Sequence, residues 1–173
     1  SPAAPDTPAQ SILITDSSTF ADNVAEAISR RLQVLPRASI ARKSWEAQGA
    51  IIVVNALEDA ASLVDHIAPE HLELAISNPD AFAKKIRHAG AIFLGRYTPE
   101  AIGDYVAGPN HVLPTSRSAR FSSGLGILDF MKRTTLVTCD AESLRRIGPA
   151  AVLLAEAEGL DAHALSVSIR LND

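Results

Sequence analysis

Two proton-transfer groups stand side by side in the segment IAPEHLEL, residues 67–74. Glu70 and His71 follow Pro69 and precede an apolar run that predicts a β-strand. Glutamate and histidine are common general acids and bases in enzymes. Ligands in open α/β sheets gather at the carboxyl ends of strands, whereas this pair precedes its strand, so position alone favours an ordinary polar joint. The residue types leave both interpretations open.

Three further segments carry side chains that could contact a ligand. Asp104 lies in IGDYV, where apolar neighbours would leave a buried carboxylate in need of a partner. His111 lies in GPNHVLPT, where turn-forming residues fix the backbone and favour a functional role. Glu158 and His163 lie on either side of Gly159, an arrangement also typical of an ordinary helix end in which histidine interacts with the helix dipole.

A metal site can be composed from His71, Asp104, His111 and His163, because nitrogen and oxygen donors suit zinc. Their spacing matches no local zinc signature, so the residues alone do not decide for it. Cys139 has no basic neighbour in the sequence and is expected to be a buried core thiol. The GLG at residues 124–126 lacks the preceding strand and third glycine of a dinucleotide-binding fingerprint.

Composition bounds the class of protein. The chain has 173 residues, of which 47% are hydrophobic, and a net charge of -4, which argues against nucleic acid or a membrane surface as a partner. A single cysteine fits a reducing compartment. The start, SPAAPDTPAQ, lacks the features of a signal peptide, and no apolar stretch approaches the roughly 20 residues of a spanning helix. We therefore expect a cytoplasmic, soluble protein.

The elements that must position these side chains alternate along the chain. Short apolar runs at residues 11–15, 50–54, 72–76 and 91–95 predict buried strands. Segments 18–32, 57–68 and 79–90 have helical periodicity, and another short helix is expected from Thr98. The order predicts an α/β, Rossmann-like domain with a mostly parallel sheet flanked by helices, over residues 10–125.

The ends of the chain differ from this pattern. Residues 1–9 are expected to be a disordered or cloning-derived lead. Residues 107–126 are rich in Gly, Pro, Ser and Arg, and a loop of this length is usually functional or disordered. Residues 126–173 predict a mainly helical C-terminal tail, with a β-like TTLVTC, a helix capped by Asp140 and a kink at Pro149. This tail is too thin to form its own core, so we expect it to pack on a dimer partner.

Three blocks, APEHLEL, the long segment from AGAIFLGRY to ILDFMKR, and EGLDAHALSV, resemble the histidinol dehydrogenase family. The resemblance extends from about Gln10 to Asn172 and corresponds to the C-terminal portion of that enzyme, without the region that carries most of the NAD contacts. It implies an NAD- and zinc-dependent oxidoreductase that converts L-histidinol through L-histidinal to L-histidine in histidine biosynthesis.

The resemblance also implies a role for each matching residue. Glu70 and His71 match the catalytic pair, in which the histidine takes protons and the glutamate activates water. Asp104 and His163 match metal ligands, and the zinc orients the substrate. Three residues match substrate-binding positions: His111, Glu158 and His163. The C-terminal tail is implied to cross to the other subunit of a homodimer.

The sequence departs from the family pattern at two expected zinc ligands. Two further zinc ligands of the family fall on Pro2 and Pro5, whose side chains cannot bind metal. We therefore expect an incomplete zinc sphere and a chain that is inactive alone, with cofactor-binding residues unknown. The alternative is a truncated, non-catalytic relative that acts as a dimerising or small-imidazole-binding module.

Overall fold

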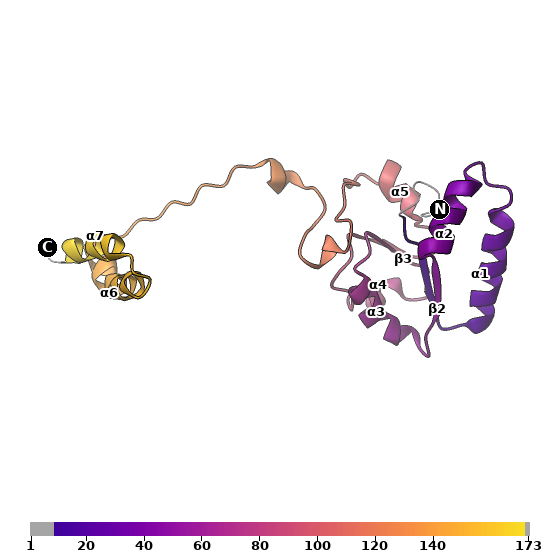
Figure 1. The fold of residues 1–173 in the computed structure, drawn as a ribbon, viewed down its shortest axis with the longest axis horizontal. Helices are drawn as coiled ribbons and strands as arrows, with labels where there is room; N and C mark the ends of the chain where they lie inside the picture. The colour runs from indigo at the N-terminus through magenta and orange to yellow at the C-terminus, as the bar shows by residue number, and fades with distance from the viewer. Residues whose placement is uncertain (1–8, 172–173) are drawn as a thin grey trace. The chain divides into compact units, whose positions relative to one another are not determined.

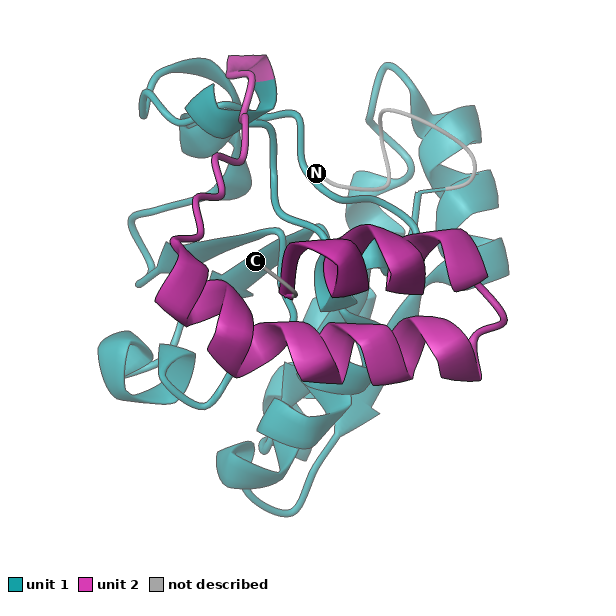
Figure 2. Cartoon of the chain, turned by 90° about the vertical axis from the view of Figure 1, so that its left-hand side faces the viewer, with its two compact units in different colours: residues 1–129 teal, residues 130–173 magenta. Residues whose placement is uncertain are grey.

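The chain divides into two compact units, residues Ser1–Asp129 and Phe130–Asp173 (Figure 2). The computed structural model describes residues 9–171. Pro2, Pro5 and nearly all of the expected lead therefore lie outside the described residues. The division between the units falls a few residues after the boundary that the sequence predicts at residue 125.

The four apolar runs form four short strands of the first unit: β1 (Ile12–Thr15), β2 (Ala50–Val53), β3 (His71–Leu74) and β4 (Ala91–Leu94). Strand β1 pairs in parallel with β2, and β3 pairs in parallel with β4, with His71 opposite Ala91. The mixed α/β fold with parallel strands flanked by helices is therefore confirmed. Within the described residues the strands are joined as two separate pairs, whereas the sequence predicts one mostly parallel sheet.

Helices cover these strands, with α1 and α2 on one side and α3 and α4 on the other (Figure 1). The bounds are α1 (Ser18–Arg31), α2 (Ala38–Gln48), the 3-10 turn η1 (Leu57–Asp59), α3 (Ala60–Ile67), α4 (Pro79–Ala83) and α5 (Glu100–Tyr105). Sequence periodicity misses α2, whose buried residues are Ala41 and Ser44. A buried face made of small and polar side chains gives no apolar stripe to detect.

Helix α4 is much shorter than the helix that the sequence predicts over residues 79–90. The carboxylate of Asp65 in α3 explains the early end. Its Oδ1 accepts hydrogen bonds from the backbone N–H groups of Arg87 and His88, at 2.8 and 3.0 Å. A carboxylate that takes two successive amides removes them from a continuing helix and fixes the chain that leads into β4.

The core of the first unit is centred on Ala60, Leu74 and Phe82, and Leu72 packs against these residues. Alternate side chains of a strand point to opposite faces. Because Leu72 and Leu74 of β3 face this core, His71 and Glu73 face the other side of the strand. The fold therefore presents two ionisable side chains of one strand on a common face.

The loop after α5 contains two 3-10 turns, η2 (Ser118–Arg120) and η3 (Ile127–Phe130). The segment TTLVTC beyond it forms no strand and is fully exposed, so the β-like interpretation is wrong. A strand needs a neighbour for its backbone hydrogen bonds, and none of the described residues supplies one. Cys139 is exposed as well, which corrects the expected buried thiol.

The second unit contains two helices, α6 (Ala141–Ala157) and α7 (Asp161–Leu171), which lie side by side (Figure 2). The Asp140 side chain caps α6 by accepting a hydrogen bond from Ser143 N–H at 2.7 Å, and the helix continues through Pro149. Gly148 is buried in the contact, where an added Cβ would lie 3.2 Å from Val167 Cγ1. Among the described helices, none combines the length and the apolarity needed to cross a bilayer.

Candidate active site at the start of strand β3

The chain turns sharply just before the site, at a residue with left-handed backbone angles. Ala68 ends α3 with φ 50° and ψ 63°, and its N–H donates to the carbonyl of Val64 at 2.7 Å. Such a conformation is uncommon outside glycine and asparagine, and the Cβ of Ala68 is almost completely buried. The sharp change of direction, followed by Pro69, places Glu70 and His71 at the point where the chain enters β3.

His71 is enclosed by side chains from β4 and α5. Its ring lies 5.9 Å from the Phe93 ring, measured between centroids. Its Nδ1 lies 3.9 Å from Glu100 Oε1, and its Nε2 lies 3.5 Å from Asp104 Oδ1. Nε2 is buried and makes no hydrogen bond. The structure therefore brings the predicted residues His71 and Asp104 together and adds Glu100.

Glu100 is the member of this cluster that the sequence does not single out. A signal was present, because Glu100 and Asp104 are four positions apart and lie on one face of a short helix. Their side chains are 17% and 28% exposed, so both carboxylates are held mostly out of water. The sequence could not show that this face would meet β3, because the contact depends on the tertiary fold.

Helix α5 is attached to β3 by a hydrogen bond. The Glu100 backbone N–H donates to Glu73 Oε1 at 2.7 Å. Glu73 is two residues after His71 on the same strand face, so one strand carries both the imidazole and the carboxylate that holds the opposing helix. Gly103 lets this helix approach closely, because an added Cβ would lie 2.4 Å from Phe93 Cε1.

The electrostatics of the cluster are set by burial. Burial raises the pKa of the Glu100 carboxyl above its usual value. The adjacent His71 imidazole opposes this increase in pKa, and the nearby Asp104 and Glu73 carboxylates add to it. Two carboxyl groups, those of Glu100 and Asp104, lie beside the His71 imidazole, and this arrangement suits a bound cation.

The remaining predicted residues lie elsewhere. Glu70, beside His71 in the sequence, is half-buried as a residue, and within the described residues its side chain makes no hydrogen bond or ion pair. His111 is exposed in the loop after α5 and is not part of the cluster. Glu158 and His163 belong to the second unit, at the end of α6 and in the first turn of α7, and both are exposed. Gly159 between them has φ 71°, which allows the tight turn between the helices.

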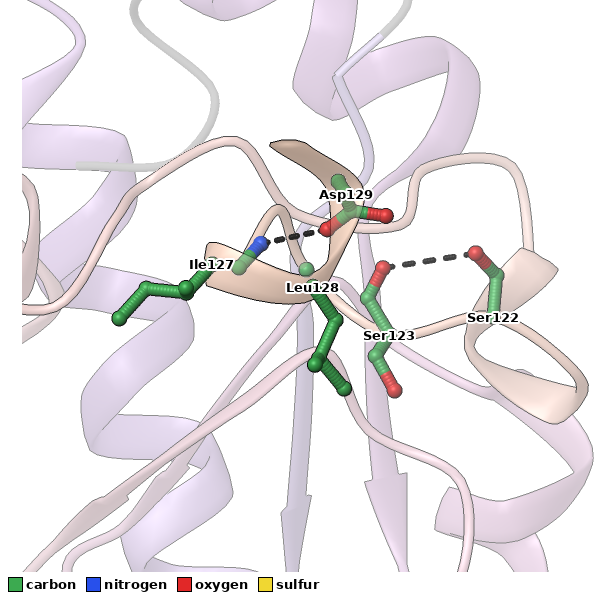
Figure 3. A pocket seen from close by; sticks show the side chains of 7 residues that line it. Ser122, Ser123, Ile127, Leu128 and Asp129 are labelled. Atoms are coloured by element: carbon green, nitrogen blue, oxygen red, sulfur yellow. Dashed lines mark hydrogen bonds between the residues drawn. The ribbon is translucent and has the colours of Figure 1, made fainter. Parts of the chain in front are cut away.

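An open hollow of about 450 Å³ lies away from this cluster (Figure 3). It is lined by Ser122, Ser123, Gly124, Gly126, Ile127, Leu128 and Asp129. Asp129 Oδ2 is already used by the Gly126 N–H at 2.7 Å, and Ser122 donates to the carbonyl of Ser123. Within the described residues the lining contains no histidine, and Asp129 is its single charged residue.

The donor atoms at His71 fit a divalent metal ion. One ligand atom each from His71, Glu100 and Asp104 lies within 4.8 Å of the others. An imidazole nitrogen and carboxylate oxygens are donors that zinc accepts. The buried Nε2 without a hydrogen bond is a further sign that a ligand or a proton acceptor belongs beside it. The described residues offer no comparable fit for NAD, since no glycine-rich turn joins a strand to a helix.

The fold and the site together define an α/β protein with a histidine placed between two carboxylates. The sequence model of the family described as histidinol dehydrogenase matches residues 1–171, and the chain belongs to this family.

Individual members of the family are also similar to this chain. The histidinol dehydrogenase of Rhodospirillum rubrum is 68% identical over 173 residues, covering 99% of this chain and 40% of that protein. The histidinol dehydrogenase of Gluconobacter oxydans is 63% identical over 166 residues, covering 96% of this chain and 39% of that protein. The crystal structure of histidinol dehydrogenase from Elizabethkingia anophelis superposes with a TM-score of 0.84 at 37% identity, covering 98% of this chain and 39% of that one. The chain thus spans about 40% of the length of the curated relatives it matches.

Proposed function

We propose that this chain is the C-terminal portion of an NAD- and zinc-dependent L-histidinol dehydrogenase, which oxidises L-histidinol through L-histidinal to L-histidine. The observation that carries the proposal is the buried Nε2 of His71, which makes no hydrogen bond and lies 3.5 Å from Asp104 Oδ1, in a chain of this family. A general base must reach the proton that it abstracts, and a ring nitrogen that makes no hydrogen bond is available for that contact.

In this proposal His71 accepts protons from the substrate, and Glu70 activates the water that hydrates the aldehyde. Glu70 is suited to this role because it is next to His71 in the sequence and its side chain makes no hydrogen bond or ion pair among the described residues. His111, Glu158 and His163 bind the substrate. All three side chains are exposed in their own units and so are available for contacts beyond them.

Asp104 and His163 are the proposed zinc ligands of this chain. Bound zinc would hold and orient the imidazole and amino nitrogens of the substrate beside His71. Asp104 is supported by its place in the donor cluster. His163 lies in α7 of the second unit, and its assignment comes from the family resemblance.

The chain alone is proposed to lack turnover, since no phosphate-binding turn for NAD is present in the described residues. We further propose a cytoplasmic homodimer in which the C-terminal tail is exchanged. Support comes from the large apolar side chains that α6 and α7 leave exposed: Ile147, Leu153, Leu154, Leu165 and Ile169. A helix pair with this much exposed apolar surface requires a further surface to pack on.

A chimera tests the catalytic role. This chain would replace the matching 40% of the Rhodospirillum rubrum protein, with which it shares 68% identity. One version would begin the replacement at Gln10 and keep the relative's residues in place of Pro2 and Pro5. NADH formation from L-histidinol is expected, and His71→Ala should reduce kcat by about 100-fold or more, the usual scale for loss of a general base.

Two controls complete this experiment. The version that retains Pro2 and Pro5 should bind less zinc and turn over more slowly. His88→Ala, which alters a histidine outside the cluster, should leave kcat unchanged. A Gln10 chimera that folds, binds zinc and is still inactive would favour the non-catalytic alternative, and unaltered turnover in His71→Ala would remove the proposed base.

A further inference from the structure

The position of α5 depends on few contacts. The helix has six residues, too few for stability by itself, and it carries two of the three donor residues of the cluster. Short helices in proteins are held by tertiary contacts. The tertiary contacts of α5 therefore determine where Glu100 and Asp104 lie relative to His71.

Glu73 supplies the polar contact. Its Oε1 accepts the Glu100 N–H at 2.7 Å, a short distance for a backbone amide and typical of a charged acceptor. The α5 N-cap residue, Pro99, makes no side-chain hydrogen bond to the helix. The Glu73 carboxylate of β3 instead accepts a hydrogen bond from the first turn of α5, as a capping side chain would.

The strand geometry makes this contact more than a local cap. Residues two apart on a strand share a face, so His71 and Glu73 project from β3 together. A single strand thus determines both the position of the imidazole and the position of the helix that faces it. Movement of α5 away from Glu73 would lengthen the distances from His71 to Glu100 and to Asp104, which are now 3.9 and 3.5 Å.

We infer that Glu73 is a positioning residue of this site: its carboxylate holds α5 against β3 and thereby sets Asp104 and Glu100 around His71. The inference rests on the proposed function of His71 and Asp104 and adds a residue to which neither the family resemblance nor the cluster itself assigns a role. Glu73 contacts neither the imidazole nor a metal; it acts through the helix.

The direct test uses NMR on the whole 173-residue chain. Glu73→Ala removes the acceptor, and Glu73→Gln keeps a carbonyl oxygen at the same place without the charge. In Glu73→Ala we expect the Glu100 amide proton to move upfield and the ring nitrogens of His71 to shift. In Glu73→Gln we expect both signals to stay close to those of the unaltered chain. Glu58→Ala is the matched control, because Glu58 is an exposed glutamate of the same unit.

The Gln10 chimera adds a kinetic readout. Loss of a group that orients ligands or bases indirectly costs about 10- to 100-fold in activity or metal affinity. Glu73→Ala is expected to lower kcat on this scale while KM for histidinol changes little, and Glu73→Gln should restore most of kcat. A thermal midpoint recorded for each variant separates this effect from instability.

The possible results distinguish failure of the positioning role of Glu73 from failure of the proposed function. If His71→Ala abolishes turnover but Glu73→Ala leaves both kcat and the His71 ring signals unchanged, the positioning role is wrong while the proposed function stands. The role is also wrong if Glu73→Ala lowers only the thermal midpoint, or if Glu73→Gln behaves as Glu73→Ala does. If His71→Ala itself leaves turnover intact, the proposed function fails, and the NMR comparison alone decides whether Glu73 holds α5.

Discussion

Gly103 of α5 lies against the ring of Phe93 in β4, so closely that a Cβ at residue 103 would be 2.4 Å from Cε1 and 2.8 Å from Cζ. Phe93 is buried and also contacts His71. The absence of a side chain at one position thus lets a short helix reach the strand pair that carries the imidazole.

We expect Gly103→Ala to displace α5. Alanine favours a helix over glycine by about 1 kcal/mol, but overpacking a buried contact costs about 1–3 kcal/mol, so the net effect should be destabilising. Urea unfolding and the NMR signals of His71 would measure it. Gly126→Ala is a suitable control, because the nearest atom to its added Cβ lies 3.8 Å away. A Gly103→Ala chain more stable than the original would show that Phe93 moves aside freely.

Asp140 is expected to make the second unit sensitive to acid. The hydrogen bond from Ser143 N–H to its carboxylate lowers the pKa of Asp140 below its usual value. A group with a lowered folded-state pKa contributes stability above its unfolded pKa, near 4, and loses it as the pH falls through the folded value. Circular dichroism should therefore show α6 weakening in acid. Asp140→Ala should lower helicity at neutral pH, whereas Asp140→Asn should retain the cap and remove this pH dependence.

Zinc should bind the isolated chain far more weakly than a complete site, because a zinc site requires about four ligands. Of the ligands that the resemblance implies, only Asp104 and His163 are present. Calorimetry at neutral pH should show weak binding that Asp104→Ala reduces further, with His88→Ala as the control. Stoichiometric nanomolar binding would contradict this expectation. If that binding were also lost in Glu100→Gln, the ligands would be His71, Glu100 and Asp104 instead.

The chain should self-associate through its second unit. Leu153 and Leu165 are 67% and 61% exposed, which is unfavourable for large apolar side chains unless another surface covers them. Sedimentation equilibrium across micromolar concentrations is expected to show dimers, and Leu153→Glu combined with Leu165→Glu should yield monomers. A wild-type chain that is monomeric throughout this range would argue against an exchanged tail.

The strands and the longest helix of the first unit are predictable from the sequence because their burial is apolar and periodic. Helix α2 is not, since Ala41 and Ser44 form its buried contacts. The length of α4 could not be read either, because it depends on Asp65, a residue of another helix.

The candidate site likewise contains residues that the sequence predicts and residues that it does not. His71 and Asp104 were identified by residue type and by family resemblance, and the structure places them 3.5 Å apart. Glu73 and Glu100 resemble ordinary surface glutamates in the sequence. Their contacts arise from the approach of α5 to β3, which no local pattern encodes.

The two strand pairs also differ in how far apart their partners lie along the chain. His71 pairs with Ala91, whereas Ile12 pairs with Ala50 across a crossover about twice as long that contains both α1 and α2. A doubling of loop length adds only about 0.6 kcal/mol of closure entropy, but contacts between distant residues also form more slowly. The pair that carries His71 should thus acquire its register first during folding, before the N-terminal strands join. Its amides should then be the first to become protected in a pulsed hydrogen-exchange experiment.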